Sequence, residues 1–191
     1  MKVAGGFTMY DRDALISIVR EKALRFGDFT LASGKKASYY LDCRCVALDS
    51  AGIKLIADGM IATWGDQWPD AVGGMAVGAV PITAGILSCV GGDPEKAALR
   101  GFFVRKEAKE YGAGKQIEGP VNPGDKVMIV EDVVTTGGSS IKAIKQCEEF
   151  GLEVMGITAI IDRLAGGAEA FADAGYELKT LLTVRDFGIE S

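Results

Sequence analysis

A chain of 191 residues with 48% hydrophobic and 25% charged side chains has the size and composition of one globular domain with a sizeable core. Its formal net charge of −5 does not favour a nucleic-acid partner, so cations that bind an anionic ligand must be gathered locally. No apolar run approaches the length of a membrane span, and no basic region followed by an apolar one marks the N-terminus. We therefore expect a cytoplasmic protein with no membrane partner.

The chain contains no histidine, and this absence narrows the possible chemistry. It excludes histidine-based triads, HExxH metalloenzymes and an imidazole general base. Any reaction must therefore depend on carboxylates, Lys and Arg, hydroxyls, backbone dipoles or a hard metal ion. The four cysteines lack paired CxxC spacing, and their surroundings predict buried free thiols rather than zinc ligands or disulfides: Cys43, Cys45, Cys89 and Cys147.

The first third of the chain predicts two helices separated by an irregular segment. Residues 11–26 are amphipathic, with Leu24 among the apolar side chains on one face, and predict a helix. Residues 29–43 predict two short strands around a turn at residues 34–35. Residues 50–64 again show helical periodicity.

The rest of the chain alternates apolar strands with helices. We expect strands at residues 71–75, 98–104, 127–130, 154–161 and 178–184, and helices near 81–89, 141–150 and 168–174. This alternation predicts an α/β fold with a mostly parallel central sheet flanked by helices. Ligands of such sheets bind beyond the carboxyl ends of the strands. The loops that follow strands should converge there, on one rim: residues 76–80, 105–120, 132–139 and 162–166.

The most informative segment is residues 127–140, VMIVEDVVTTGGSS. An apolar strand is followed by two carboxylates, Glu131 and Asp132, then by small residues that open into a helix. Unpaired N–H groups at the start of a helix form a site for a phosphate. Acids beside a phosphate normally repel it, so these acids should bind neutral groups such as ribose hydroxyls, or a metal that bridges to a second anionic group.

Other nucleotide motifs fit this segment less well. The phosphate loop of NTPases needs a Lys after its glycines, where this chain has Ser139 and Ser140, and the dinucleotide motif has its acid about 20 residues downstream. An ordinary strand–turn–helix with surface acids is the alternative. The order of acids, threonines and glycines resembles the diphosphate-sugar motif of the type I phosphoribosyltransferases.

A second segment refines the resemblance. Residues 105–119 form a long loop with four cations, and a solvated surface loop is the alternative interpretation. Long loops are often lids, and Gly112 and Gly114 would allow closure. The pattern Arg105-Lys106, Lys109 and Tyr111-Gly112 resembles the mobile loop R-K-x-x-K-x-H/Y-G of orotate phosphoribosyltransferases, with Tyr111 where many members have His.

The resemblance implies one domain over residues 1–191, with the type I phosphoribosyltransferase fold and a small N-terminal hood within about residues 1–45. In the hood, some members have a Lys at the position of Ala32, and Lys35, Lys36 and Arg44 are candidate substitutes. We do not assign Tyr39 or Tyr40 as ligands, because both fit an alternating strand. Arg163 and Thr135 match the residues that bind orotate.

The resemblance further implies transfer of the 5-phosphoribosyl group from 5-phosphoribosyl 1-diphosphate to orotate in pyrimidine biosynthesis. It implies a homodimer in which Lys106 reaches the neighbouring site, and Mg²⁺ bridged through the substrate rather than by assigned protein ligands. Catalytic roles fall to Arg105, Lys106 and Lys109. The residues expected to bind the phosphoribosyl donor are Arg105, Lys106, Lys109, Tyr111, Glu131, Asp132, Val133, Val134, Thr135, Thr136, Gly137, Gly138 and Ser139.

Two alternatives remain open from the sequence. One is a phosphoribosyltransferase for a purine or another nucleobase, which would have no use for a carboxylate-binding Arg163. The other is a non-catalytic regulator of the same fold that senses nucleotides and binds nucleic acid. A regulator should have a basic face, and a pI near 4.9 with both acids retained argues against it.

Overall fold

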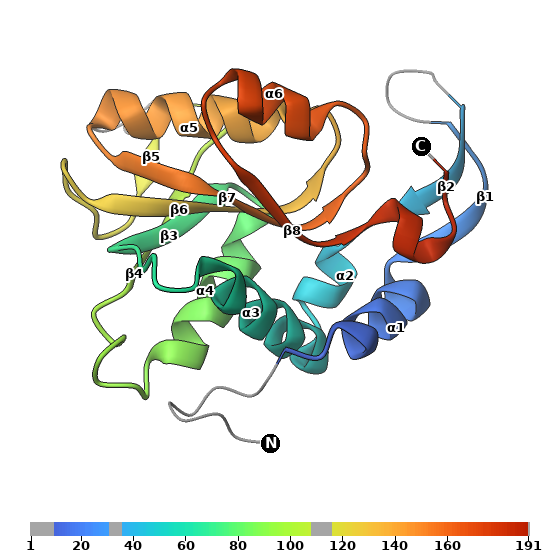
Figure 1. Cartoon of the computed structure of the whole chain (residues 1–191), viewed down its shortest axis with the longest axis horizontal. Coiled ribbons are helices and arrows are strands. Elements are labelled where there is room, and N and C mark those ends of the chain that lie inside the picture. The colour runs from blue at the N-terminus through green and yellow to red at the C-terminus, as the bar shows by residue number, and fades with distance from the viewer. Residues whose placement is uncertain (1–9, 31–35, 108–115, 191) are drawn as a thin grey trace.

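The computed structural model describes residues 10–30, 36–107 and 116–190, and Figure 1 shows their arrangement. A six-stranded sheet in the order β5-β4-β3-β6-β7-β8 forms the centre. Neighbouring strands are parallel except for β4 and β5, which confirms the predicted mostly parallel sheet. Its strands are β3 (Ala71–Met75), β4 (Arg100–Val104), β5 (Ile117–Glu118), β6 (Lys126–Val134), β7 (Glu153–Asp162) and β8 (Leu178–Thr183).

Helices cover both faces of the sheet (Figure 1). The helices α3 (Ser50–Trp64) and α4 (Ala79–Val90) lie on one face, and α5 (Gly138–Phe150) and α6 (Gly167–Asp173) on the other. Alternate residues of β6 serve the two layers: Val130 joins the α3–α4 core, whereas Ile129 joins the α5–α6 core. Because both faces of the sheet are covered, the central strands have continuous apolar sequences and not alternating apolar and polar residues.

The N-terminal segment forms a separate hairpin beside the sheet. It follows α1 (Arg12–Lys22), consists of β1 (Leu24–Thr30) and β2 (Lys36–Leu41), and leads into α2 (Arg44–Ala47). The prediction of a helix through residue 26 was wrong at its end, because Leu24 pairs with Leu41 in the hairpin and is buried there. The second predicted strand is confirmed as β2. The first was predicted to begin at residue 29, whereas β1 begins five residues earlier, at Leu24. The predicted turn at residues 34–35 lies outside the described residues.

Several further element boundaries differ from the sequence predictions. The strand predicted to end at residue 130 continues to Val134, because Glu131 and Val133 still pair with β7. The loop predicted over residues 105–120 contains β5, which pairs antiparallel with β4. The last predicted strand ends one residue earlier, and a short 3-10 helix, Val184–Phe187, follows it.

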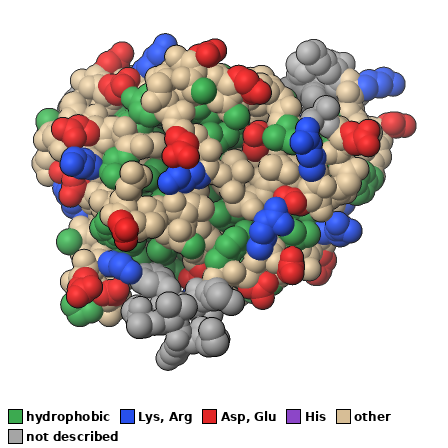
Figure 2. Space-filling view, viewed as in Figure 1, with side chains coloured by type: hydrophobic (Ala, Val, Ile, Leu, Met, Phe, Trp, Pro, Cys, Tyr) green, Lys and Arg blue, Asp and Glu red, His purple; other side chains and the backbone are tan. Residues whose placement is uncertain are grey.

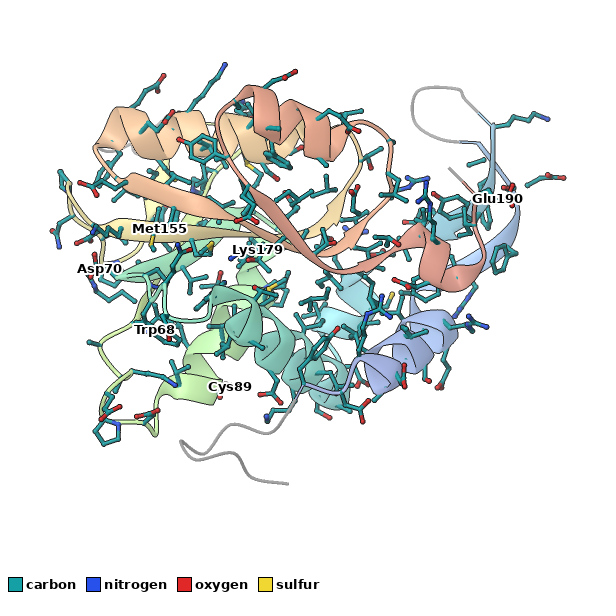
Figure 3. The ribbon with its side chains drawn as sticks, viewed as in Figure 1. Trp68, Asp70, Cys89, Met155, Lys179 and Glu190 are labelled. Carbon is teal, nitrogen blue, oxygen red and sulfur yellow. The ribbon has the colours of Figure 1, made fainter. Side chains whose placement is uncertain are left out.

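All four cysteines are free thiols, as predicted, but their burial is not uniform. Cys43 and Cys147 are buried, whereas Cys45 is exposed and Cys89, near the end of α4 (Figure 3), is half-buried. The prediction of burial was therefore wrong for Cys45 and Cys89. Among the described helices, none has the length and apolar character needed to cross a membrane.

Candidate active site

The loop between β6 and α5 forms a small polar depression of about 110 Å³. Gly137, which precedes α5, has φ 76°, a left-handed conformation that favours glycine, and a Cβ there would lie 3.3 Å from the Phe171 ring. No side chain caps this helix in the described part of the chain. Its first N–H groups are therefore available to an anion. The depression is lined by Glu131, Val133, Val134, Thr135, Thr136, Gly137, Gly138, Ser139 and Ser140.

Glu131 lies beneath this loop and is only 7% exposed. The Ser140 hydroxyl donates to its Oε2 over 2.6 Å, and the Asp132 backbone N–H donates to its Oε1 over 3.2 Å. Burial is the main cause that raises the pKa of Glu131 to about 8, and the Asp132 carboxylate adds to this against the opposing effect of the Ser140 hydrogen bond. At neutral pH, Glu131 is therefore mainly protonated, which removes the repulsion expected between an acid and a phosphate.

Asp132 connects the depression to the loop after β3. Its Oδ1 accepts from the Val133 N–H over 2.9 Å. An added Cβ on Gly78 would lie 2.7 Å from the same Oδ1, so a residue with a side chain could not approach the carboxylate as closely. The predicted convergence of residues 76–80 and 132–139 on one rim is confirmed by this contact.

Arg163 follows β7 on the same rim. Its backbone N–H donates to the Val134 carbonyl over 2.9 Å, which places it next to the strand that leads to Thr135. Its Nε donates to the Tyr39 hydroxyl over 2.9 Å, and its guanidinium lies 4.8 Å from the centre of the Tyr39 ring. The hairpin is thereby joined to the rim through Tyr39, a residue to which the sequence analysis assigned no role.

The basic loop is described in part. Arg105 Nε donates to Glu118 Oε1 over 2.8 Å, and the exposed Lys106 accepts at its carbonyl from Lys142 Nζ over 3.0 Å. The predicted loop residues Lys109 and Tyr111 lie outside the described residues.

Of the cations considered as substitutes in the hood, Arg44 forms a two-point ion pair with Asp42 at 2.7 and 2.6 Å. This pairing raises the pKa of Arg44 and lowers that of Asp42. Lys36 is exposed at the start of β2. Ala32 and Lys35 lie outside the described residues.

Comparison with known proteins agrees with this geometry. A family model for the phosphoribosyl transferase domain matches residues 49–175. The orotate phosphoribosyltransferase of Rhodopirellula baltica is 57% identical over 186 residues, which cover 94% of this chain and 95% of that protein. The chain belongs to the orotate phosphoribosyltransferase family.

Solved structures of this family share the fold along nearly the whole chain. The orotate phosphoribosyltransferase of Mycobacterium tuberculosis superposes with a TM-score of 0.82 at 34% identity, over 93% of this chain and 99% of that chain. A structure of that enzyme in complex with 5-phospho-α-D-ribosyl 1-diphosphate superposes with a TM-score of 0.77 at 30% identity, over 93% and 99% of the two chains. The fold class predicted from the sequence is therefore confirmed.

Proposed function

We propose that this orotate phosphoribosyltransferase family member transfers the 5-phosphoribosyl group from 5-phosphoribosyl 1-diphosphate to orotate, giving orotidine 5'-phosphate and diphosphate in pyrimidine biosynthesis. One observation carries the proposal. The uncapped start of α5, the carboxyl groups of Glu131 and Asp132, and Arg163 lie on the same rim of the sheet. The relatives named orotate phosphoribosyltransferase support it.

The phosphoribosyl donor would lie along the β6–α5 loop. Its 5-phosphate would accept hydrogen bonds from N–H groups of residues 135–139, and the ribose hydroxyls would lie against Asp132 and Glu131. The volume of about 110 Å³ suits one phosphate group rather than a whole nucleotide, so the sugar must extend outward toward Asp132. Val133 and Val134 would form the floor under the sugar.

The reaction needs no side-chain nucleophile. When the bond between C1 and the leaving oxygen breaks, positive charge develops on the ribose and negative charge on the diphosphate, and N1 of orotate then attacks C1. Asp132 would favour the cationic sugar, while Arg105, Lys109 and Lys106 of the partner subunit would stabilise the departing diphosphate. This division of charge suits a chain without histidine.

Mg²⁺ fits the residues present if the substrate supplies most of its ligands. No group of three or more acidic, Cys or His side chains that could hold a metal occurs among the described residues, so this part of the chain provides no complete metal site. Mg²⁺ commonly binds through substrate phosphates and keeps several waters. Bound in this way, with the substrate rather than a set of protein side chains as its main source of ligands, it would supply positive charge that offsets the negative charge of the leaving group.

A homodimer is part of the proposal. Val77 is 72% exposed, and an apolar groove of about 320 Å³ runs between α4 and the β4–β5 edge, with Val80 and Leu87 in its lining. A second copy of the chain would cover this apolar surface. Light scattering of the purified protein should then give twice the mass of the 20.1 kDa chain.

Orotate recognition by Arg163 gives a direct prediction. A guanidinium binds a carboxylate through two parallel hydrogen bonds, which a Lys cannot do. The variant Arg163→Lys should raise KM for orotate by about tenfold or more, since hydrogen bonds to charged groups contribute about 1.5–3 kcal/mol. KM for the phosphoribosyl donor should change by less than about threefold. An unchanged KM for orotate would remove Arg163 from base recognition.

Release of diphosphate, measured with a coupled assay, tests the function as a whole. Orotate, uracil, adenine and xanthine would each be supplied with the phosphoribosyl donor, with and without Mg²⁺. We expect diphosphate release with orotate but with none of the other three bases, and only when Mg²⁺ is present. Release with a purine would support another nucleobase phosphoribosyltransferase, and donor binding without release with any base would support a regulator.

The face of the molecule seen in Figure 2 argues against the regulator. Figure 2 shows acidic and basic side chains interspersed over the visible described surface, with no extended basic area. Because nucleic-acid binding depends on clustered Lys and Arg, this face is a poor surface for it.

A further inference from the structure

Ser140 is a buried polar residue with no part in the reaction outlined above. It lies in the first turn of α5 and is only 2% exposed. Its hydroxyl donates to Glu131 Oε2 over 2.6 Å. Glu131 belongs to β6 and lines the same depression. The hydrogen bond therefore joins the helix turn that offers N–H groups to the strand that carries the carboxyl pair.

We propose that Ser140 is a positioning residue for the phosphoribosyl donor: its hydrogen bond to Glu131 fixes the first turn of α5 against β6 and holds the phosphate-binding N–H groups in place. The inference rests on the proposed function and deepens it, because it names what keeps this site in shape.

The structure at the start of α5 shows why the first turn needs such a hydrogen bond. Many helices begin with a Ser, Thr, Asp or Asn whose side chain bonds the first N–H groups. Gly137 provides no such cap, and a cap would occupy the N–H groups that a phosphate needs. The turn is also supported by the Gly137 carbonyl, which accepts from the Ile141 N–H, and by Phe171, which packs beside Gly137. The hydrogen bond from Ser140 to Glu131 stabilises the turn from the side of β6. It leaves the N–H groups on the opposite side of the turn free for a ligand.

The charge state of Glu131 is compatible with this arrangement. The groups that act on its carboxyl are the Ser140 hydroxyl from α5 and, within β6, the side chain and backbone N–H of Asp132. With its pKa raised to about 8, Glu131 carries no charge in most molecules at pH 7. It can therefore lie beneath the β6–α5 loop and hold the helix turn without repelling a phosphate bound to that loop.

The variant Ser140→Ala tests the proposal in calorimetric titrations with 5-phosphoribosyl 1-diphosphate and Mg²⁺. We expect Kd, and KM for this substrate, to rise about tenfold, because the buried partner loses its hydrogen bond. KM for orotate and kcat should change by less than about threefold. Ser140→Thr, which keeps the hydroxyl, should restore most of the affinity.

A control separates positioning from general loss of stability. Thr158 is fully buried in β7, and its hydroxyl accepts from Trp64 Nε1 over 3.3 Å, away from the β6–α5 loop. Thr158→Val should lower the melting temperature without raising Kd. If Ser140→Ala behaved like Thr158→Val, the proposal would be overturned.

Two further readouts depend on Glu131 itself. In the unaltered chain Kd should rise as pH increases past about 8, because the ionised Glu131 repels the phosphate. Ser140→Ala should move this rise to higher pH, since the lost hydroxyl favours the ionised form. In a Glu131→Ala background, Ser140→Ala should add less than about a twofold change.

Equal effects of Ser140→Ala in both backgrounds, or an unmoved pH dependence, would contradict the proposal. If the unaltered chain failed to bind 5-phosphoribosyl 1-diphosphate, the proposed function would fail as well. Donor binding that is insensitive to Ser140 would overturn the positioning role alone.

Discussion

Replacement of Lys109 by Ala is expected to lower turnover by roughly a hundredfold or more. Loss of one group that stabilises developing negative charge typically costs about 2.7–4 kcal/mol of barrier. In the proposed mechanism the cations of residues 105–119 neutralise the departing diphosphate, and one of them, Arg105, is already paired with Glu118. The measurement is kcat for orotate-dependent diphosphate release at saturating substrates.

Lys145→Ala is a matched control for the Lys109 variant. Lys145 is an exposed residue of α5 outside the proposed site, and its replacement also removes one positive charge. It should leave kcat within about twofold. A near-normal rate for Lys109→Ala would remove the loop lysine from the mechanism.

The variant Asp132→Asn is expected to lower kcat/KM for the phosphoribosyl donor by about a hundredfold. The amide is nearly the same size, and its oxygen can still accept from the Val133 N–H, so the strand end should keep its structure. It loses the negative charge that would face the cationic ribose in the transition state. Electrostatic groups of this kind commonly contribute a factor of about 10²–10³.

The control for Asp132 is Asp173→Asn, at the exposed end of α6. Both variants should unfold at nearly the same temperature as the unaltered chain, and Asp173→Asn should keep its activity. If Asp132→Asn lost less than about threefold in kcat/KM, its carboxylate would have no electrostatic role in the reaction.

Elements with clear local signals were predicted well from the sequence. The bounds of α3 and β3 agree with the predictions, because Asp49 caps α3 through two backbone N–H groups and Gly65 ends it. The boundary of β6 was missed because the apolar run ends at Val130, whereas pairing with β7 continues through the acids. Leu24 fitted a helical face equally well, and its true strand partner, Leu41, is distant in sequence.

The same distinction applies to the site. Glu131, Asp132 and the glycine turn could be found because they are consecutive and have a recognisable order. Tyr39 meets Arg163 across 124 positions, and Gly78 meets Asp132 only when the sheet is assembled. Ser140 is the last residue of the segment 127–140, yet its proposed role depends on the burial of Glu131, which periodicity alone does not show.

A crystal structure with 5-phosphoribosyl 1-diphosphate and Mg²⁺ bound would test the central arrangement most directly. We predict that the 5-phosphate lies in the depression of the β6–α5 loop, within hydrogen-bonding distance of the N–H groups of residues 135–139, with the ribose hydroxyls against Asp132. A 5-phosphate bound elsewhere, with Asp132 and the Gly138 N–H turned away from the ligand, would contradict the account.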